Sequence, residues 1–552
     1  MELAALLRSV SSAALIRDQP LTGPQTAAAG PKLLIKDGLI QGLMLDKSYV
    51  FYGIPFADPP VAASRWKPPR PVTPWRGVHD ATYPRAACMQ AYGITRFCHS
   101  ETWLFISIED CLYLNVFVPL SVNLAAPLLK LLPVMLWIHG GDFIAGSASK
   151  QLYDGRYISN FTQTLVVSVA YRLGAFGFLV SGKDPWTSAA GNYGILDQQA
   201  ALLWVQQNIA VFGGDPSRVT LFGESAGAQS VSLHLMIQSS EALFRQAVFQ
   251  SLPFSIPLKT RHESLKLGKN FAKSANCSVL ELPCLQSLSP QEVLNVLNPF
   301  RFLEQFESWG PYVDGELIRE QAVSAFLKGH WQKDKPVLLG TLSSSLTVSM
   351  NSNCSCSLAT VCSRDHLRRR SDLCVRRLHE ARVTNKCSLA ERKSPDSFTF
   401  QIVTDYIFLC PSRRSARAGV ASGSSVWMYV FDHVASDPGV WSGLTFCYRH
   451  ACHGAELPFV FDSAPVANLS MTPAERLLSN RMLCYWGAFA HTGDPGSHAD
   501  SSAFCRQQRP PAWPRYTANS GWLIMNLTLH SHAQTGSRED ICDFWDTLGI
   551  YP

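Results

Sequence analysis

The stretch Val219-Thr-Leu-Phe-Gly-Glu-Ser-Ala-Gly227 decides the fold of this chain of 552 residues. Its first four residues are a short apolar run that predicts a buried strand, and the residues after Ser225 predict a helix. Between them lies a G-x-S-x-G pattern in the strand–turn–helix context that gives it meaning, although ordinary glycine turns also produce the pattern. Small flanking residues permit a sharp turn that lifts the serine hydroxyl above the sheet edge. Ser225 is therefore the candidate nucleophile.

Neighbouring segments predict the rest of the sheet. Pro133–His139 and Leu165–Ala170 are apolar runs typical of buried strands, and two glycines close the first run. Leu196–Phe212 predicts an amphipathic helix that ends at the following glycines. Apolar strands alternating with helices indicate an α/β fold, with a central, mostly parallel sheet and helices on both faces.

Acyl transfer from a serine requires N–H donors for the developing oxyanion. Gly140 and Gly141 follow an expected strand in Trp137-Ile-His-Gly-Gly141, and adjacent glycines let backbone amides approach a substrate. We assign these two amides and the amide of Ala226, directly after the nucleophile, to the oxyanion hole. A simple turn closing a strand is the alternative interpretation of the glycine pair.

The reaction also requires a histidine that takes the serine proton and returns it to the leaving group. The chain has 15 histidines, so chain position has to select among them. In this fold the histidine follows the serine and the acid, which favours a late one. We choose His453, in the loop-like context Cys452-His-Gly-Ala-Glu, over the alternatives His491 and His498.

Composition sets the class of protein. The chain is 47% hydrophobic and 16% charged, which describes a globular protein with a large core. Its formal charge is +6, but residues 342–397 hold ten Lys or Arg and five Asp or Glu, so +5 lies there and +1 elsewhere. A nearly neutral body argues against a nucleic-acid protein. No apolar run reaches the roughly 18–20 residues that a membrane span requires.

Two features point to the secretory route or the endoplasmic reticulum lumen. The chain has 16 cysteines, enough for several disulfides. It also has acceptor sequences for N-linked glycans that begin at Asn160, Asn276, Asn353, Asn468 and Asn526. The first residues do not form a clear signal peptide, because Arg8 interrupts their apolar stretch.

The domain organisation is a tail at residues 1–30 followed by a single domain at residues 31–552. Within that domain, residues 342–396 are atypical: they are rich in Ser, Arg and Cys and have no helical or alternating periodicity. Three interpretations fit: a surface insertion, a basic docking loop, or sequence from an unusual splice or a frame error. The sharp change in composition at both flanks favours the last.

Several motifs together resemble the type-B carboxylesterase and cholinesterase family. They occur in the order characteristic of that family and cover most of the chain apart from the tail and residues 342–396. The motifs are Phe51-Tyr-Gly-Ile-Pro-Phe56, Glu109-Asp-Cys-Leu-Tyr-Leu-Asn115, Trp137-Ile-His-Gly-Gly141, Ala190-Gly-Asn-Tyr-Gly194, Phe212-Gly-Gly-Asp-Pro216, Phe222-Gly-Glu-Ser-Ala-Gly227 and His453-Gly-Ala-Glu-Leu-Pro-Phe-Val-Phe461.

The resemblance implies an α/β-hydrolase that hydrolyses a small-molecule ester without a cofactor or a metal. It also implies a disulfide corresponding to Cys88–Cys111. Cys277 and Cys284 look similar to a second family bridge, and Cys447 and Cys452 are a candidate third, with separate buried thiols as the alternative in each case. The particular ester and the oligomeric state are left open.

One family feature is missing. The family carries its triad acid, usually a glutamate, shortly after a strand ending in Gly-Thr, and here that position falls near Ser345. A serine hydroxyl cannot stabilise an imidazolium by charge, and loss of the acid typically costs on the order of 10⁴-fold in turnover. The other acids considered are Asp365, Asp372 and Glu380 in the atypical segment, Glu224 and Glu456 as electrostatic support, and Asp314 as a turn residue.

The sequence thus leaves three functional interpretations. The leading one is a serine carboxylesterase with an impaired triad. The second is a catalytically weak, cholinesterase-like binding or adhesion protein, although Ser225 is retained and no membrane anchor is evident. The third is a defective isoform of an ordinary esterase in which residues 342–396 replace the segment that carries the acid.

Overall fold

The computed structural model describes residues 28–91, 107–126, 130–182, 184, 187–296, 308–343, 401, 403–441, 445–536 and 538–548. Ser345 and nearly all of the atypical segment lie outside these residues, as do Asp365, Asp372 and Glu380. The first described strand begins at Ala28, at the end of the predicted tail of residues 1–30. Main-chain pairing of Ala28 with Met44 requires no apolar side chain, which is why composition did not reveal it.

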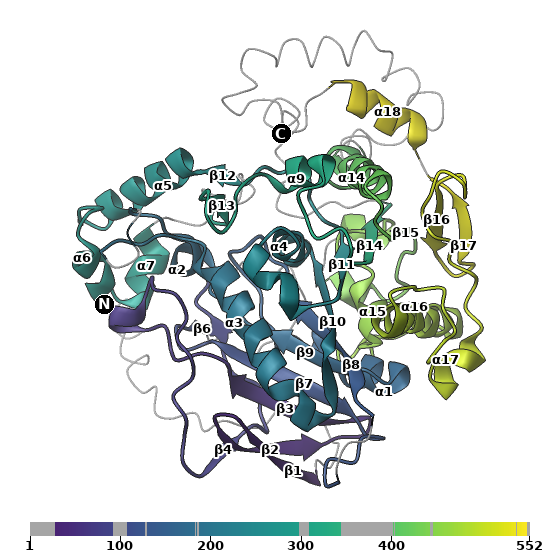
Figure 1. Cartoon of the computed structure of the whole chain (residues 1–552), viewed down its shortest axis with the longest axis horizontal. Coiled ribbons are helices and arrows are strands. Elements are labelled where there is room, and N and C mark those ends of the chain that lie inside the picture. Colours follow the sequence, from purple (N-terminus) through teal and green to yellow (C-terminus); the bar gives the residue numbers. More distant parts are fainter. Residues whose placement is uncertain are drawn as a thin grey trace, which may run out of the picture.

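A twisted sheet of 13 strands forms the centre of the described part of the chain (Figure 1). Its strands pair in parallel from β9 to β16 and antiparallel toward both edges, except that β4 pairs with β2 in parallel. In spatial order they are β1 (Ala28–Ile35), β2 (Gly38–Met44), β3 (Ser48–Pro55), β7 (Tyr113–Pro119), β9 (Leu165–Val169), β8 (Leu132–Ile138), β10 (Gly214–Glu224), β11 (Gln246–Gln250), β14 (Val337–Leu342), β15 (Val426–Phe431), β16 (Leu523–Leu527) and β17 (His532–Thr535), with β4 (Val78–Asp80) beside β2.

Two further sheets have two strands each within the described ranges: β5 (Ala87–Cys88) with β6 (Ser107–Ile108), and β12 (Lys259–Thr260) with β13 (Tyr312–Val313). The remaining helices around the central sheet are α2 (Gly174–Phe178), α5 (Arg261–Ser274), α6 (Leu282–Ser287), α7 (Pro290–Val296), α9 (Ala322–Lys328), α14 (Cys410–Ala421), α17 (Ala503–Gln508) and α18 (Glu539–Leu548).

Helices cover both faces of the central sheet, as the apolar strands predict. Alternate residues of β8 point to opposite faces: Leu136 belongs to the core under α3 (Tyr193–Asn208) and α4 (Ala226–His234). Trp137 belongs to the second core, under α1 (Arg156–Thr162), α15 (Leu457–Phe461) and α16 (Pro473–Thr492). In Figure 1, α3 and α4 lie in front of the strands. The predicted α/β architecture, a mostly parallel sheet with helices on both faces, is confirmed.

The helix expected at Leu196–Phe212 is wrong in its character and its bounds. The α-helix α3 begins at Tyr193, and the last four residues form the 3-10 helix η4 (Ile209–Phe212). Apolar Leu203 is 45% exposed, whereas Asp197 is fully buried, so the helix is not amphipathic. The cause is a buried polar layer, since Asp197 forms a bidentate ion pair with Arg172.

Disulfides tie peripheral segments to the domain. The structure contains the expected bridges Cys88–Cys111 and Cys277–Cys284, and the candidate pair Cys447–Cys452 is also bridged. The bridges Cys410–Cys542 and Cys484–Cys505 were not anticipated, because their partners are 132 and 21 residues apart and no local pattern marks them.

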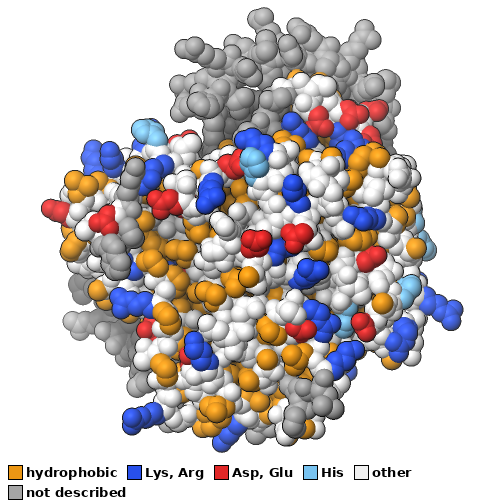
Figure 2. Space-filling model, viewed as in Figure 1, with side chains coloured by type: hydrophobic (Ala, Val, Ile, Leu, Met, Phe, Trp, Pro, Cys, Tyr) orange, Lys and Arg blue, Asp and Glu red, His pale blue; other side chains and the backbone are white. Residues whose placement is uncertain are grey.

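The surface of the described part carries mixed charges. On the face shown in Figure 2, basic and acidic side chains are interspersed among apolar ones. Among the described helices, none is long and apolar enough to cross a membrane.

Candidate active site

Ser225 occupies a strained turn between the end of β10 and the start of α4. Its φ of 59° and ψ of −122° are rarely adopted by a residue other than glycine. A Cβ on Gly227 would lie 2.0 Å from the carbonyl oxygen of Ile138, so only glycine allows α4 to approach β8 this closely. The Ser225 amide donates to the carbonyl of Gln250, which fixes the turn against β11. The predicted nucleophile therefore has the geometry of a nucleophile elbow.

The turn after β8 lies beside this serine. A Cβ built on Gly140 would be 3.1 Å from Ser225 Cβ, which places the two backbones in contact. Gly141 has a φ of 118°, and a Cβ there would be 2.1 Å from the carbonyl oxygen of Ala145. No described residue accepts a hydrogen bond from the amides of Gly140 or Gly141, and Ala226 starts a helix, where amides have no intrahelical acceptor. The three predicted oxyanion donors thus gather around Ser225.

Buried polar contacts hold the glycine turn in place. His139 Nδ1 lies 2.8 Å from the Gly140 carbonyl, and its ring stacks on Tyr171 at 4.5 Å between centroids. Burial lowers the pKa of His139 to about 3, so the ring is neutral and donates to that carbonyl. Gln90 binds both main-chain groups of Gly146, accepting from its N–H and donating to its C=O. These contacts preorganise the turn before a substrate arrives.

The structure brings His453 to the same place from a distant part of the chain. Its Nε2 lies 2.9 Å from Oε1 of Glu224, the residue before the nucleophile, and both side chains are less than 10% exposed. The contact is an ion pair by distance, although its alignment falls short of a hydrogen bond. Phe408, in the π-helix η6 (Asp405–Leu409), packs against the imidazole at 5.1 Å between centroids. By contrast, the alternative His491 hydrogen-bonds to the Thr162 carbonyl.

The other ring nitrogen, His453 Nδ1, is buried and has no hydrogen-bond partner among the described residues. Burial alone would lower the pKa of this histidine, but the charges of Glu224 and Glu456 outweigh burial and raise it. Ser345, the expected acid position, lies outside the described residues. Asp314 is a turn residue, as predicted, because its Oδ1 accepts from the amides of Glu316 and Ile318.

A second carboxylate lies behind the histidine. Glu456 is fully buried, its Oε1 accepts a hydrogen bond from Gln250, and Gln250 in turn accepts one from the indole of Trp486. Burial and the charge of Glu224 raise the pKa of Glu456. Gln250, Trp486 and Phe408 were missed by the sequence analysis, since apolar and amide residues far apart in the chain carry no motif.

The loop that carries His453 is closed by a disulfide. Cys452 directly precedes the histidine and bridges to Cys447, at the 3-10 helix η8 (Thr445–Tyr448), five residues before it. Both half-cystines are 1% exposed. The bridge therefore restricts the loop immediately before the histidine.

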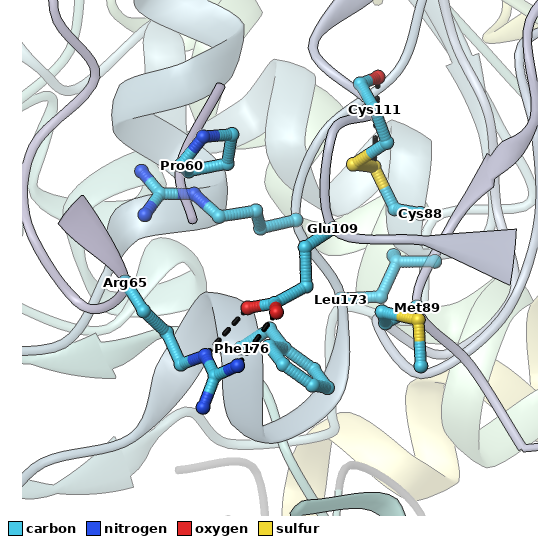
Figure 3. A pocket seen from close by; sticks show the side chains of 9 residues that line it. Pro60, Arg65, Cys88, Met89, Glu109, Cys111, Leu173 and Phe176 are labelled. Carbon is cyan, nitrogen blue, oxygen red and sulfur yellow. Dashed lines mark hydrogen bonds and ion pairs between the residues drawn. A yellow bond between two sulfur atoms is a disulfide. The ribbon is translucent and has the colours of Figure 1, made fainter. Parts of the chain in front are cut away.

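A small cavity elsewhere on the domain is lined by residues whose contacts stabilise the fold. It lies at the Cys88–Cys111 bridge, and Figure 3 shows Arg65 hydrogen-bonded to the Glu109 carboxylate beside it. Arg65 Nε and Nη2 reach the two oxygens of Glu109 at 2.5 and 2.6 Å. The same guanidinium donates to the Leu288 carbonyl, so the pair links three chain segments. Among the described residues, no cluster of His, Cys, Asp and Glu is placed to hold a metal ion.

Comparisons with known proteins agree with this fold. Residues 29–545 match the carboxylesterase family. The chain is 34% identical over 545 residues to an acetylcholinesterase of Bungarus fasciatus, covering 93% of this chain and 86% of that one. It is 32% identical over 529 residues to the crystal protein of Dictyostelium discoideum, covering 94% and 91%. The crystal structure of a Geobacillus stearothermophilus carboxylesterase superposes with a TM-score of 0.74 at 30% identity, covering 94% of this chain and 100% of that chain.

Fold and sequence together define an α/β-hydrolase, which confirms the resemblance drawn from the motifs. The chain belongs to the carboxylesterase family and is a carboxylesterase-like hydrolase.

Proposed function

We propose that this protein hydrolyses carboxylic esters through an acyl-enzyme on Ser225, with His453 as general base and then general acid. The observation that carries the proposal is the convergence of three separate segments on one point. The strained Ser225 turn, the amides of Gly140 and Gly141, which have no acceptor among the described residues, and the buried histidine come together beside the carboxyl edge of β8 and β10. Such convergence is what acyl transfer requires.

In the first half-reaction, Ser225 Oγ attacks the ester carbonyl carbon while His453 takes the hydroxyl proton. The carbonyl electron pair moves onto oxygen, and the resulting oxyanion accepts hydrogen bonds from the amides of Gly140, Gly141 and Ala226. Collapse of this intermediate expels the alcohol, which receives the proton from His453. A water molecule then repeats the sequence on the acyl-enzyme and releases the carboxylic acid.

Hydrolysis of a short-chain nitrophenyl ester tests the proposal. We expect wild-type turnover, and loss of at least about 10³-fold in both Ser225→Ala and His453→Ala. His491→Ala is the matched control, because this histidine bonds to the Thr162 carbonyl and should keep wild-type turnover. Turnover that survives Ser225→Ala would refute the proposal, and a folded wild type without turnover would favour a binding role.

We also infer that the chain enters the secretory route. Five disulfides within the described residues require an oxidising compartment, and Asn276 and Asn468 are exposed acceptor sites. Expression in a eukaryotic secretory host followed by glycosidase digestion should show a mobility shift. The shift should shrink in Asn276→Gln and Asn468→Gln, and an unaltered mobility of the wild type would contradict the inference.

A further inference from the structure

The Glu224 carboxylate lies between the two halves of the candidate site. It is the last residue of β10 and precedes Ser225, so the strained turn fixes where its side chain can reach. Its Oε1 lies 2.9 Å from His453 Nε2. A Cβ built on Gly140 would lie 2.8 Å from its Oε2, so the other oxygen faces the oxyanion turn. Glu224 is thus held against both the base and the oxyanion donors.

Among the described residues, Glu224 is the ion-pair partner of His453. The ring is otherwise covered by Phe408, while Nδ1 has no hydrogen-bond partner within the described part of the chain. Among the described residues, the titratable groups that surround this pair are Glu456, on the histidine loop, Tyr429, on β15, and Tyr171, which follows β9. Burial and the nearby carboxylates raise the pKa of Tyr429 far above its ordinary value, so the phenol stays neutral.

The two buried carboxylates divide their roles. Like charges in one dry site cannot both ionise freely, so one of the pair takes up a proton more readily. Burial and the charge of Glu224 raise the pKa of Glu456. The carboxylate charge closest to the imidazole is that of Glu224, whose Oε1 lies 2.9 Å from Nε2, whereas Oε1 of Glu456 accepts a hydrogen bond from Gln250. In a poorly hydrated site such a charge acts much more strongly than at the surface.

We propose that Glu224 is the counter-ion that stabilises the His453 imidazolium during acyl transfer, in place of a triad acid after β14. When Ser225 Oγ bonds to the ester carbon, its proton moves to Nε2, and the new N–H forms next to Glu224 Oε1. The proton later passes to the leaving alkoxide, and Glu224 stays deprotonated throughout. This inference rests on the proposed ester hydrolysis and explains how it proceeds with serine at position 345.

The negative charge of Glu224 determines the direction in which it shifts the pKa of His453. A carboxylate beside Nε2 favours the protonated ring, so it raises the pKa of His453 and moves the acidic limb of the kcat/KM profile to higher pH. Glu224→Gln removes the charge but keeps the shape of the side chain. We expect the pKa of His453 to fall by about one unit or more, and kcat/KM at its optimum to fall by about 10²-fold.

The experiment uses two readouts on the full chain. The first is the titration of the His453 ring by NMR of histidine-labelled protein, assigned with His453→Gln. The second is the pH profile of kcat/KM for a short-chain nitrophenyl ester. Glu456→Gln is the matched control: Glu456 is hydrogen-bonded to Gln250 and its charge contributes less to the pKa of His453 than the charge of Glu224, so both readouts should move less than in Glu224→Gln.

A matching downward shift of the titration and of the acidic limb, with the loss in rate, supports the proposal. An unchanged pKa of His453 overturns the ion pair with Glu224. A lowered pKa with an unchanged kcat/KM overturns the role of Glu224 in the reaction. Absence of any Ser225-dependent turnover in the wild type overturns the proposed function and this role with it, while the titration still reports the ion pair by itself. If Glu224→Gln does not fold, Glu224→Asp withdraws the carboxylate by about 1.5 Å, and an unmoved titration there also overturns the pairing.

Discussion

The disulfide before His453 should matter more for catalysis than for stability. Removing it by the double change Cys447→Ala and Cys452→Ala opens a loop in which the partners are only 5 residues apart. The chain-entropy relation for this separation gives a loss of about 2 kcal/mol in the free energy of unfolding. The bridge Cys484–Cys505 spans 21 residues, and the same relation gives about 3 kcal/mol for it.

For activity we expect the opposite ranking: removing the bridge Cys447–Cys452 should cost more than removing the bridge Cys484–Cys505. Cys452 is bonded to His453 through one peptide unit, so release of Cys447 frees the main chain that positions the imidazole. A displacement of about 1 Å of a catalytic group can cost about 10²-fold in rate, and we expect a loss of that order. Cys484 and Cys505 join α16 to α17 and do not belong to the histidine loop, so their removal should leave kcat/KM within about threefold of wild type.

The assay combines thermal unfolding with ester hydrolysis at a temperature below both transitions. The loop-bridge variant should melt higher than the α16–α17 variant and yet hydrolyse the ester more slowly. Full activity in the loop-bridge variant, or a loss of activity in both variants that is proportional to their loss of stability, would contradict this prediction.

Two further predictions concern the elbow and a buried acid. Gly227→Ala places a Cβ 2.0 Å from the Ile138 carbonyl oxygen, so it should lower the free energy of unfolding by about 1–3 kcal/mol and abolish nearly all activity. Gly419→Ala is the control: it lies in another helix, its nearest contact is at 3.3 Å, and it should change stability and activity little. Equal melting temperatures and rates for the two variants would contradict this prediction. Burial raises the pKa of Asp462 to about 6, above its unfolded value, so its contribution to stability is lost as pH rises toward 6. Asp462→Asn keeps the contact with Ser479 but cannot ionise, so its melting temperature should fall less between pH 4 and pH 7 than that of the wild type. Parallel curves of melting temperature against pH would contradict this prediction.

The sheet and the sharp strand-to-helix turn at Ser225 could be predicted because local sequence determines them. Apolar runs such as Leu165–Val169 are buried on both sides, and the glycines around Ser225 are required by backbone approach alone. The polarity of α3 could not be predicted, because Asp197 is buried by a partner, Arg172, that lies 25 residues away in the sequence. Hydrophobic periodicity in a sequence predicts which apolar residues are buried, but not which polar residues are buried with them.

The site was predicted in part for the same reason. Ser225, Gly140 and Gly141 sit in short motifs, whereas Phe408 and Gln250 reach the site only through the fold. Glu224 was considered as electrostatic support, but its contact with His453 joins residues 229 positions apart and no spacing rule gives it. The acid position at Ser345 lies outside the described residues and stays a prediction.

The most direct test of the central claim is covalent labelling of the folded chain with a fluorophosphonate, followed by peptide mapping by mass spectrometry. We expect one phosphonyl group per chain on the peptide that contains Ser225, no labelling after Ser225→Ala, and slower labelling after His453→Ala. Labelling on a different residue, or a folded wild type that does not react, would contradict it.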